Sequence, residues 1–470
     1  MADDGRSGGT DGVAREATLP PLYGVRIIDL TMVWAGPYAT RLLADAGADV
    51  IKIEGVTRPD SIRTSGAMAL GGVERPFDRV AYFNEYNRNK RGLALDLSRP
   101  EGRAALLRLV RVADALIENF RAGVLEGWGL GPERLLAERP DLVIVSMPGF
   151  AKRGSERDLA GYGPTIEQLG GLIQLTGYPG DGPEKSGISY GDPIAGTMAA
   201  GAMIAALLRR RRTGQGAVVE VSQRDNMLNM IGEAVLDYCM NRRLPERRGN
   251  RHRWMAPHGC YPSLPLPEAE GRPLGRAGQP TGVATDRWVT IAVATDAQWQ
   301  ALCRVIGRPD LAEDPRYAQA LGRYERQDEL DAIIANWTRQ RSDDEAMTLL
   351  QAAGVPAAAV RTPLAQTRDP HLAERGFYRE IEHPVAGRYR VAGPLWNVSS
   401  PRPEIVRPAP VFGQHRVEVL GDLAGYDAEA LAELEREQVI GDEPVKRPAT
   451  PAANDAAATA SPREATGGRR

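Results

Sequence analysis

The first half of the chain alternates short apolar runs with amphipathic segments. The apolar runs predict buried strands at 25–30, 49–54, 115–117, 142–147 and 217–221. Segments 37–45 and 100–112 carry apolar residues at helical spacing and predict helices between the strands. Because a strand, a helix and a second strand in this order form a crossover connection, the pattern predicts a parallel sheet and an α/β fold.

A longer run of small and apolar residues, 194–208, predicts a buried helix. It follows directly after Tyr190-Gly191-Asp192-Pro193. Asp is favoured at the N-cap and Pro at the first helical position, so Asp192 is predicted to cap this helix. Since a helix N-terminus also stabilises anions, Asp192 is either an ordinary cap or a carboxylate held to attack a carbonyl. The run is shorter than the roughly 20 apolar residues that span a bilayer, so we expect no membrane partner.

The pattern changes after residue 225 and divides the rest of the chain. We expect a large domain over 20–225, and a linker with a mobile loop over 226–284, where Pro, Gly and Arg become frequent. A small domain is expected over 285–385, with a strand at 286–293 and helices near 296–307, 326–338 and 343–353. The polar termini, 1–19 and 444–470, are predicted to be disordered.

Composition places the chain among ordinary soluble globular proteins and excludes several classes. Its 470 residues suffice for two or three domains, and 42% are hydrophobic and 26% charged. The net charge of -2 gives no reason to expect a nucleic acid as partner. Three scattered cysteines without a CxxC pair, and an N-terminus without an apolar signal segment, indicate a cytoplasmic protein. The five histidines form no HExxH-like pair, so we expect no metal site.

The turns after the predicted strands carry the candidate chemistry. Residues 31–37 follow the first strand without a GxGxxG pattern, which removes the main support for a dinucleotide-dependent oxidoreductase. Lys90, Arg91 and Arg121 lie at predicted strand ends, where a parallel sheet binds its ligands. They could bind phosphates, although the spacing alone favours solvated charges.

Several blocks in the same order resemble the class III CoA-transferases, the CaiB/BaiF family, which includes formyl-CoA and carnitine CoA-transferases. The matching blocks are 24–37, 43–54, 87–91, 118–123, 212–216, 288–293 and 353–357. The resemblance covers roughly residues 20 to 425 and implies a large Rossmann-like domain with a parallel sheet and a smaller α+β domain. It further implies that a returning segment, about 386–430, completes the large domain, and that two chains form an interlocked homodimer.

The resemblance also implies an activity and a nucleophile. Asp192 matches the aspartate that attacks the acyl-CoA carbonyl in this family, giving a mixed anhydride and then an aspartyl-CoA thioester. Such chemistry requires an ionised carboxylate held in position near donors for the oxyanion. The implied function is CoA transfer from an acyl-CoA donor to a free carboxylic acid. CoA is then a substrate, and no permanently bound cofactor is expected.

The family's CoA contacts match less firmly than its nucleophile. The corresponding positions are Val33, Trp34, Ala35, Lys90, Arg91, Asn119, Phe120, Arg121, Trp128 and Tyr162. Some members carry an arginine where this chain has Gly55, and Arg58 or Arg63 is a candidate substitute. The segment from Gly271 to Gly282 is the expected counterpart of the glycine-rich loop that shields the intermediate in this family.

Two alternative functions share the fold. An α-methylacyl-CoA racemase needs an acid and a base on either side of the α-carbon. Residues 148–170 contain no histidine, and 161–165 contain no aspartate where a racemase has one, which argues against this reaction. A non-catalytic CoA-binding subunit of a heteromeric transferase is the second alternative, and the presence of Asp192 argues against it. The segments 162–164 and 190–193 are similar to a branch with aromatic-acid and succinyl-CoA-dependent members.

Overall fold

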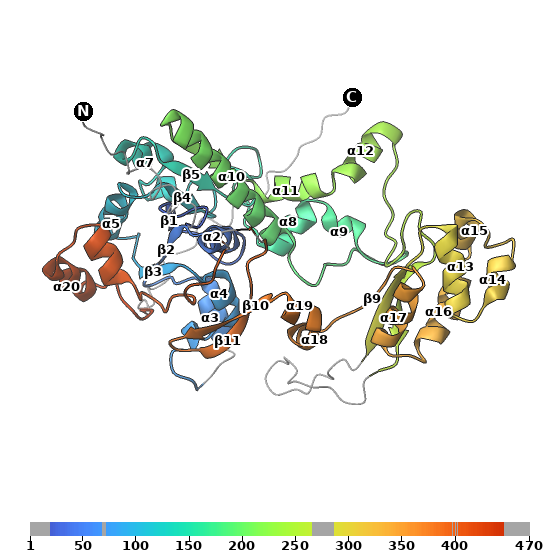
Figure 1. The fold of residues 1–470 in the computed structure, drawn as a ribbon. Helices are drawn as coiled ribbons and strands as arrows, with labels where there is room; N and C mark the ends of the chain where they lie inside the picture. The colour runs from blue at the N-terminus through green and yellow to red at the C-terminus, as the bar shows by residue number, and fades with distance from the viewer. Residues whose placement is uncertain are drawn as a thin grey trace, which may run out of the picture.

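The computed structural model describes residues 19–67, 72–265 and 286–445, apart from residues 397, 400 and 402. Figure 1 shows a larger α/β unit and a smaller unit, which two stretches of chain connect. The outgoing stretch contains α11 (Gln223–Met230) and α12 (Gly232–Asn241), and the returning stretch contains α18 (Pro363–Thr367) and α19 (Pro370–Glu374). The segment 271–282 and most of both predicted disordered termini lie outside the described residues.

Six parallel strands form the sheet of the larger unit in the order β3-β2-β1-β4-β5-β6. They are β1 (Arg26–Asp29), β2 (Asp49–Glu54), β3 (Arg91–Ala94), β4 (Ala115–Glu118), β5 (Val143–Ser146) and β6 (Ala217–Glu220). The predicted strands are confirmed, and β3 is an addition that the apolar pattern did not indicate. The strand order reverses between β1 and β4, and ligands of such sheets bind outside the carboxyl ends at this point.

Both faces of the sheet are covered, because successive side chains of each strand point to opposite sides. Ile27 belongs to the core beneath α2 (Ala35–Asp45) and α10 (Gly191–Thr213), whereas Ile28 belongs to the core beneath α5 (Pro100–Val110). Burial on both faces explains why these strands are continuous apolar runs rather than alternating ones.

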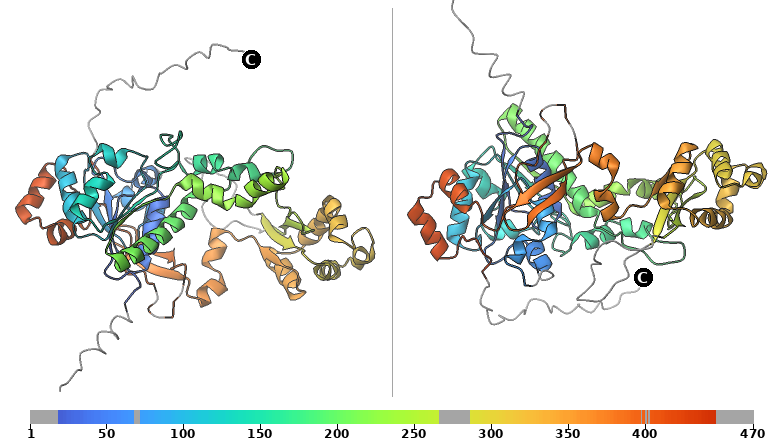
Figure 2. Two further views of the ribbon diagram at one scale, coloured as in Figure 1. Left: turned by 90° about the horizontal axis from the view of Figure 1, so that it is seen from above. Right: turned by 60° about the horizontal axis from the view of Figure 1, so that its bottom comes forward.

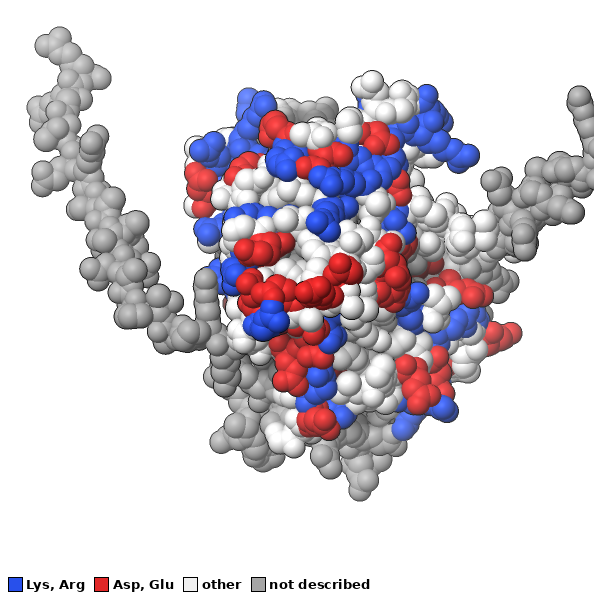
Figure 3. Space-filling model, turned by 90° about the vertical axis from the view of Figure 1, so that its left-hand side faces the viewer, with Lys and Arg blue, Asp and Glu red and all other residues white. Residues whose placement is uncertain are grey.

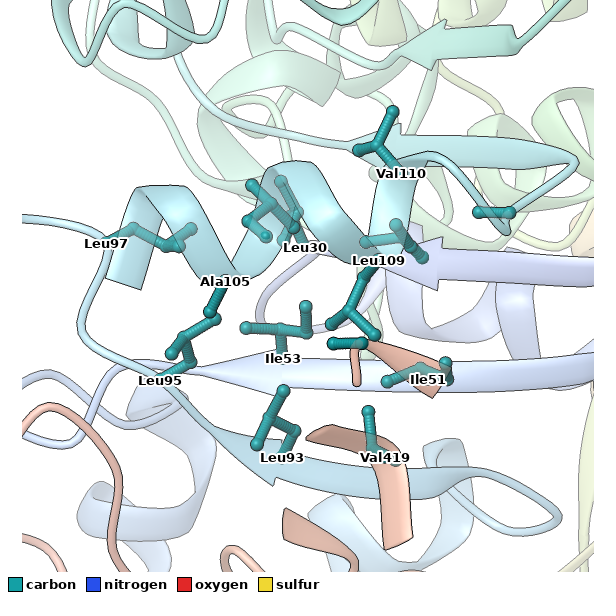
Figure 4. Packing of buried hydrophobic residues seen from close by; sticks show 14 of the residues in the cluster. Leu30, Ile51, Ile53, Leu93, Leu95, Leu97, Ala105, Leu109, Val110 and Val419 are labelled. Atoms are coloured by element: carbon teal, nitrogen blue, oxygen red, sulfur yellow. The ribbon is translucent and has the colours of Figure 1, made fainter. Parts of the chain in front are cut away.

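The C-terminal part of the chain returns to the larger unit and completes its core. Val419 packs beside Leu93 and Ile51 in Figure 4. It belongs to the π-helix η3 (Glu418–Leu423), which precedes α20 (Ala428–Arg436). Ile440 forms a β-bridge with Leu95, so the closing segment extends further than the expected 386–430.

Helix α10 differs from the prediction in two respects. It begins at Gly191 after Tyr190, and no side chain caps it, so the prediction that Asp192 is the N-cap is wrong. The helix has 23 residues, and a window of 18 of them has a mean hydropathy of 1.3, so by length and composition alone it could cross a membrane, contrary to our expectation. The helix nevertheless packs on α2 and the sheet as a core helix, with Ala195, Ala199 and Met203 buried.

The smaller unit contains an antiparallel sheet of β7 (His258–Ser263), β8 (Arg287–Ala292) and β9 (Ala357–Ala359). Its helices are α13 (Asp296–Val305), α14 (Pro309–Glu313), α15 (Ala320–Glu325), α16 (Gln327–Thr338) and α17 (Asp343–Ala352). The three predicted helices are confirmed. The segment 226–284 is not simply a linker, since it contains α12 and β7, and Tyr261 of β7 is buried in the core of this unit.

The remaining elements are short and frame the edges of the larger unit. They are α3 (Ser61–Ala67), η2 (Pro76–Asp78), α4 (Ala81–Tyr86), α6 (Val124–Gly127), α7 (Pro132–Glu138), α8 (Gly163–Leu169), α9 (Leu172–Leu175) and the hairpin of β10 (Tyr378–His383) and β11 (Gly387–Ala392). The two further views in Figure 2 show the hairpin lying against the larger unit.

On the face shown in Figure 3, basic and acidic side chains are interspersed, in keeping with the net charge of -2.

Candidate active site

A pocket of about 250 Å³ opens at the carboxyl ends of β1, β4 and β5, beside the point where the strand order reverses. It brings together residues that lie far apart in the sequence. Those predicted as site residues are Val33, Trp34, Asn119, Phe120, Arg121, Tyr162 and Asp192. Asp192 and Arg121 are the charged members of its lining.

Two loops at the strand ends are tied together and form one wall of this pocket. The Met32 N–H donates to Asn119 Oδ1 at 2.8 Å, and Asn119 Nδ2 donates to the Met32 carbonyl at 2.8 Å. Val33 has a φ of 68°, a left-handed conformation that costs a β-branched residue about 1 kcal/mol or more. Its N–H donates to Asp60 at 3.0 Å, and Asp60 is itself paired with the buried Lys52. These contacts fix the turn that leads into α2.

The carboxylate of Asp192 lies at the start of α2. It accepts a hydrogen bond from the Ala35 backbone N–H, and its residue is 8% exposed. Burial raises the pKa of Asp192 to about 6, and the nearby negative charge of Glu167 adds to this, while the hydrogen bond from Ala35 opposes it. No lysine or arginine forms an ion pair with Asp192 in the described part of the chain. The carboxylate is therefore buried, accessible from the pocket and not neutralised by a cation.

Two neighbours define the immediate space around this carboxylate. A Cβ at Gly163 would lie 1.9 Å from Asp192 Oδ2, so only glycine leaves room for the carboxylate in this position. Glu167 is fully buried in α8, and its Oε1 accepts a hydrogen bond from the Gly191 N–H at 3.2 Å. Glu167 was not among the predicted site residues, and no signal in the sequence indicated its contact with the first residue of α10.

Two aromatic side chains, Trp34 and Tyr82, also line the pocket. Trp34 packs on Tyr82 and Tyr86 of α4, with ring centroids 5.8 and 5.5 Å apart. Burial raises the pKa of the Tyr82 phenol, and the charge of Asp192 raises it further. Tyr82 therefore remains neutral at physiological pH and retains its O–H as a donor. Neither tyrosine was predicted as a site residue, because α4 shows no motif.

A second pocket of about 430 Å³ adjoins the first and shares Met32 and Phe120 with it. Trp128 lies in its wall and packs edge-to-face on Phe120, with centroids 5.5 Å apart. Arg58 also lines this pocket, and the described residues contain no ion-pair partner for it. The two pockets together form a path along the carboxyl edge of the sheet.

Three basic residues considered from the sequence are structural. Arg63 is fully buried between Glu54 at 3.0 Å and Asp78 at 2.8 Å. Lys90 Nζ lies 3.0 Å from Asp29 Oδ2, and its side chain is fully buried. Burial lowers its pKa to about 8, against the attraction of Asp29.

Arg91 is likewise held in ion pairs, with Asp49 at 2.9 Å and Glu418 at 2.9 Å. Neither Lys90 nor Arg91 lines the two pockets, and neither is the solvated charge that the spacing favoured. Ala35 is outside the pocket lining and contributes through its N–H. Within the described residues, no group of three or more His, Cys, Asp or Glu side chains is arranged to hold a metal ion.

Comparison with known proteins shows to which family the chain belongs. The model of CoA-transferase family III matches residues 22–264 and 277–416. A succinyl-CoA--D-citramalate CoA-transferase of Chloroflexus aurantiacus is 34% identical over 89% of this chain and 98% of its own length. A succinyl-CoA:mesaconate CoA-transferase of Haloarcula marismortui is 34% identical over 86% of this chain and 97% of its own.

A solved structure shows the same likeness in three dimensions. The crystal structure of a CAIB/BAIF family protein from Brucella suis superposes with a TM-score of 0.74 at 30% identity, over 86% of this chain and 100% of the other. The chain therefore belongs to CoA-transferase family III. It is an enzyme that transfers CoA between an acyl-CoA and a carboxylic acid, and the prediction made from the sequence blocks is confirmed.

Proposed function

We propose that the chain transfers CoA from succinyl-CoA to a second carboxylic acid through a thioester formed on Asp192. The observation that carries the nucleophile is the position of its carboxylate, buried in the pocket wall without a cation. The choice of donor rests on the relatives, since those from Chloroflexus and Haloarcula are named as succinyl-CoA-dependent enzymes.

The proposed cycle begins when an Asp192 oxygen attacks the thioester carbonyl. The carbon–sulfur bond breaks, leaving a mixed anhydride and CoA thiolate. The thiolate then attacks the Asp192 carbonyl carbon, which releases succinate and forms the aspartyl thioester. The acceptor carboxylate attacks this thioester, and the same steps in reverse return the free Asp192 carboxylate. Attack requires the ionised form, which dominates above about pH 6.

The two adjoining pockets suggest how CoA lies. A pocket of about 250 Å³ suits a short acyl group but not a whole CoA molecule. The 430 Å³ pocket would hold the nucleotide end, with the pantetheine arm passing Met32 and Phe120. Arg58 would then bind a phosphate, and Trp128 would provide apolar contact. Arg121, at the inner pocket, likewise has no ion-pair partner among the described residues.

An interlocked homodimer of cytoplasmic chains completes the proposal. Helix α12 has no buried residue, and its apolar side chains Leu236 and Met240 are 57% and 70% exposed. Ile204 and Leu208 of α10 are exposed as well. Apolar surface of this kind is typical of an interface between subunits. Three free cysteines, Cys239, Cys260 and Cys303, are in keeping with a reducing compartment.

Trapping of the intermediate tests the proposal. The protein is incubated with succinyl-CoA, treated with borohydride or hydroxylamine, and digested for peptide mass mapping. We expect the modification at Asp192 and its loss in Asp192→Asn, which should still bind CoA. Asp225→Asn, at the first turn of the neighbouring α11, is the matched control and should be modified as the wild type is. Modification at Glu167, or none with any acyl-CoA, would overturn the proposal.

A further inference from the structure

Glu167 is a buried carboxylate with one oxygen that has no partner. It belongs to α8, is 0% exposed, and forms no ion pair in the described part of the chain. Its Oε1 accepts the Gly191 N–H, whereas its buried Oε2 has no hydrogen-bond partner among the described residues. Because an unsatisfied buried carboxylate oxygen costs folding free energy, its presence in a folded enzyme indicates a functional role for this side chain.

The contact with Gly191 replaces a missing helix cap. No side chain of the preceding segment caps α10, and the carboxylate of Asp192 does not bind its own helix. The first N–H groups of a buried helix need an acceptor, and Glu167 supplies it from a neighbouring element. Asp192 is thereby released from the capping role that the sequence predicted and can face α2 and the pocket.

We propose that Glu167 is a positioning residue for the nucleophile: it holds the first turn of α10 in place of an N-cap and keeps a second negative charge beside Asp192. This inference rests on the proposed function of Asp192. The charge makes the Asp192 carboxylate more basic than burial alone does, which strengthens it as a nucleophile toward the thioester carbonyl.

The surroundings leave this charge without a counterion. From α4, Tyr82 and Tyr86 face Asp192, and both are neutral phenols at physiological pH. Helix α2 contributes the Ala35 N–H. Arg224, in the first turn of α11, is paired with Glu156 and is therefore not a free counterion. Arg121 lines the same pocket, but no ion pair joins it to Asp192 or Glu167 within the described residues.

Two substitutions separate the roles of position and charge. Glu167→Gln keeps a carbonyl oxygen for the Gly191 N–H and removes the charge, whereas Glu167→Ala removes both. Glu220→Gln, an exposed carboxylate at the end of β6, is the matched control. The measurements are the pH dependence of kcat/KM with succinyl-CoA, the pH dependence of borohydride trapping at residue 192, and the melting temperature.

We expect the acidic limb of the Glu167→Gln profile to move down by about one pH unit, because removal of the nearby anion favours ionised Asp192. Its kcat above pH 8 should fall about tenfold with little change in melting temperature, since the weaker base is the poorer nucleophile. Glu167→Ala should lose at least about 100-fold in kcat and also melt at a lower temperature.

The outcomes distinguish this inference from the proposed function. A Glu167→Gln profile that superimposes on that of the wild type, with trapping at Asp192 intact, overturns the role of Glu167 alone. A wild-type protein that is not modified at Asp192 by any acyl-CoA overturns the proposed function, and this inference with it. Equal shifts in Glu167→Gln and Glu220→Gln would mean a general charge effect and would also contradict the inference.

Discussion

The Asp192 carboxylate accepts a hydrogen bond from the backbone N–H of Ala35, the first residue of helix α2. The helix end that contacts this carboxylate is thus the one that follows β1, not the start of its own helix. Helix α10 reaches this place because Gly196, one turn after Asp192, lies directly against α2, where a Cβ would be 2.5 Å from the Ala35 carbonyl oxygen. Helix packing therefore places Asp192 beside the point where the strand order reverses.

Asp192→Asn should be inactive yet more stable than the wild type at neutral pH. The pKa of Asp192 is about 6 in the folded protein against 3.8 for an unperturbed aspartate, so the native state binds the proton more tightly than the unfolded state does. The resulting stabilisation is fully present below pH 3.8 and is lost as the pH rises through about 6. An ionised Asp192 therefore costs folding free energy at pH 7.5, about 3 kcal/mol, which asparagine avoids.

Urea denaturation of both proteins at pH 7.5 and pH 4.5 measures this difference. The gain of Asp192→Asn should be clear at pH 7.5 and smaller at pH 4.5. The same titration predicts that kcat/KM of the wild type falls tenfold per pH unit below about 6. A variant that is no more stable than the wild type at pH 7.5 would mean that burial does not penalise the ionised Asp192 carboxylate.

Gly163→Ala should abolish most activity without loss of CoA binding. The new methyl group would lie 1.9 Å from Asp192 Oδ2 and force the carboxylate out of its position. Because a displacement of about 1 Å in a reacting group costs about 100-fold in rate, we expect at least this loss in kcat. Gly149→Ala is the control: it lines the same pocket, and its Cβ would make an ordinary 3.5 Å contact with Ile166. Equal activity of the two variants would argue against the described orientation of Asp192.

Helix α10 offers a matched pair of glycines that tests the packing on α2. Gly196→Ala places a Cβ 2.5 Å from the Ala35 carbonyl oxygen, so it should destabilise the fold by about 1–3 kcal/mol and reduce kcat. Gly201→Ala meets no atom within 4 Å and should stabilise the same helix by up to about 1 kcal/mol. Urea denaturation and steady-state rates check both, and destabilisation of similar size in the two variants would contradict the close approach of the helices.

The sequence predicted most of the parallel sheet and the location of the pocket, because both depend on local patterns. Apolar runs mark strands that are buried on two faces, and strand ends of a parallel sheet meet at one edge. Val33, Trp34, Asn119, Phe120 and Tyr162 were predicted from the resemblance to the family, and they line the pocket at this edge. The β3 strand, by contrast, is short and preceded by charged residues, so its burial becomes visible only in the fold.

The predictions that were wrong, for Asp192, Lys90 and Arg91, depend on interactions between elements that are distant in the sequence. Asp192 carries every local sign of an N-cap, but Glu167 of another helix binds the first N–H of α10. Lys90 and Arg91 resemble free cations at a strand end, but Asp29 and Asp49 from other strands pair with them. Local spacing cannot show which partner a charged side chain meets, since that depends on the strand order.

Arg58 and Arg63 were equivalent candidates in the sequence, and the structure predicts opposite consequences for their substitution. Arg58→Gln should raise KM for the CoA thioester about tenfold and weaken its dependence on salt, because one cation on the 430 Å³ pocket is lost. Its kcat and melting temperature should remain those of the wild type. Arg63→Gln leaves Glu54 and Asp78 buried without their partner and should cost about 3–5 kcal/mol of folding free energy.

Steady-state kinetics with succinyl-CoA at two salt concentrations, together with urea denaturation, separate these effects. Arg63 also lies over the Phe83 ring, with its guanidinium carbon 3.4 Å from the centroid, so its loss removes packing as well as charge. If Arg58→Gln left KM unchanged while Arg63→Gln remained stable and raised it, the assignment of the two arginines would be reversed. In that case the nucleotide end of CoA would have to approach the sheet from the side of η2 and Asp78, which Arg63 contacts.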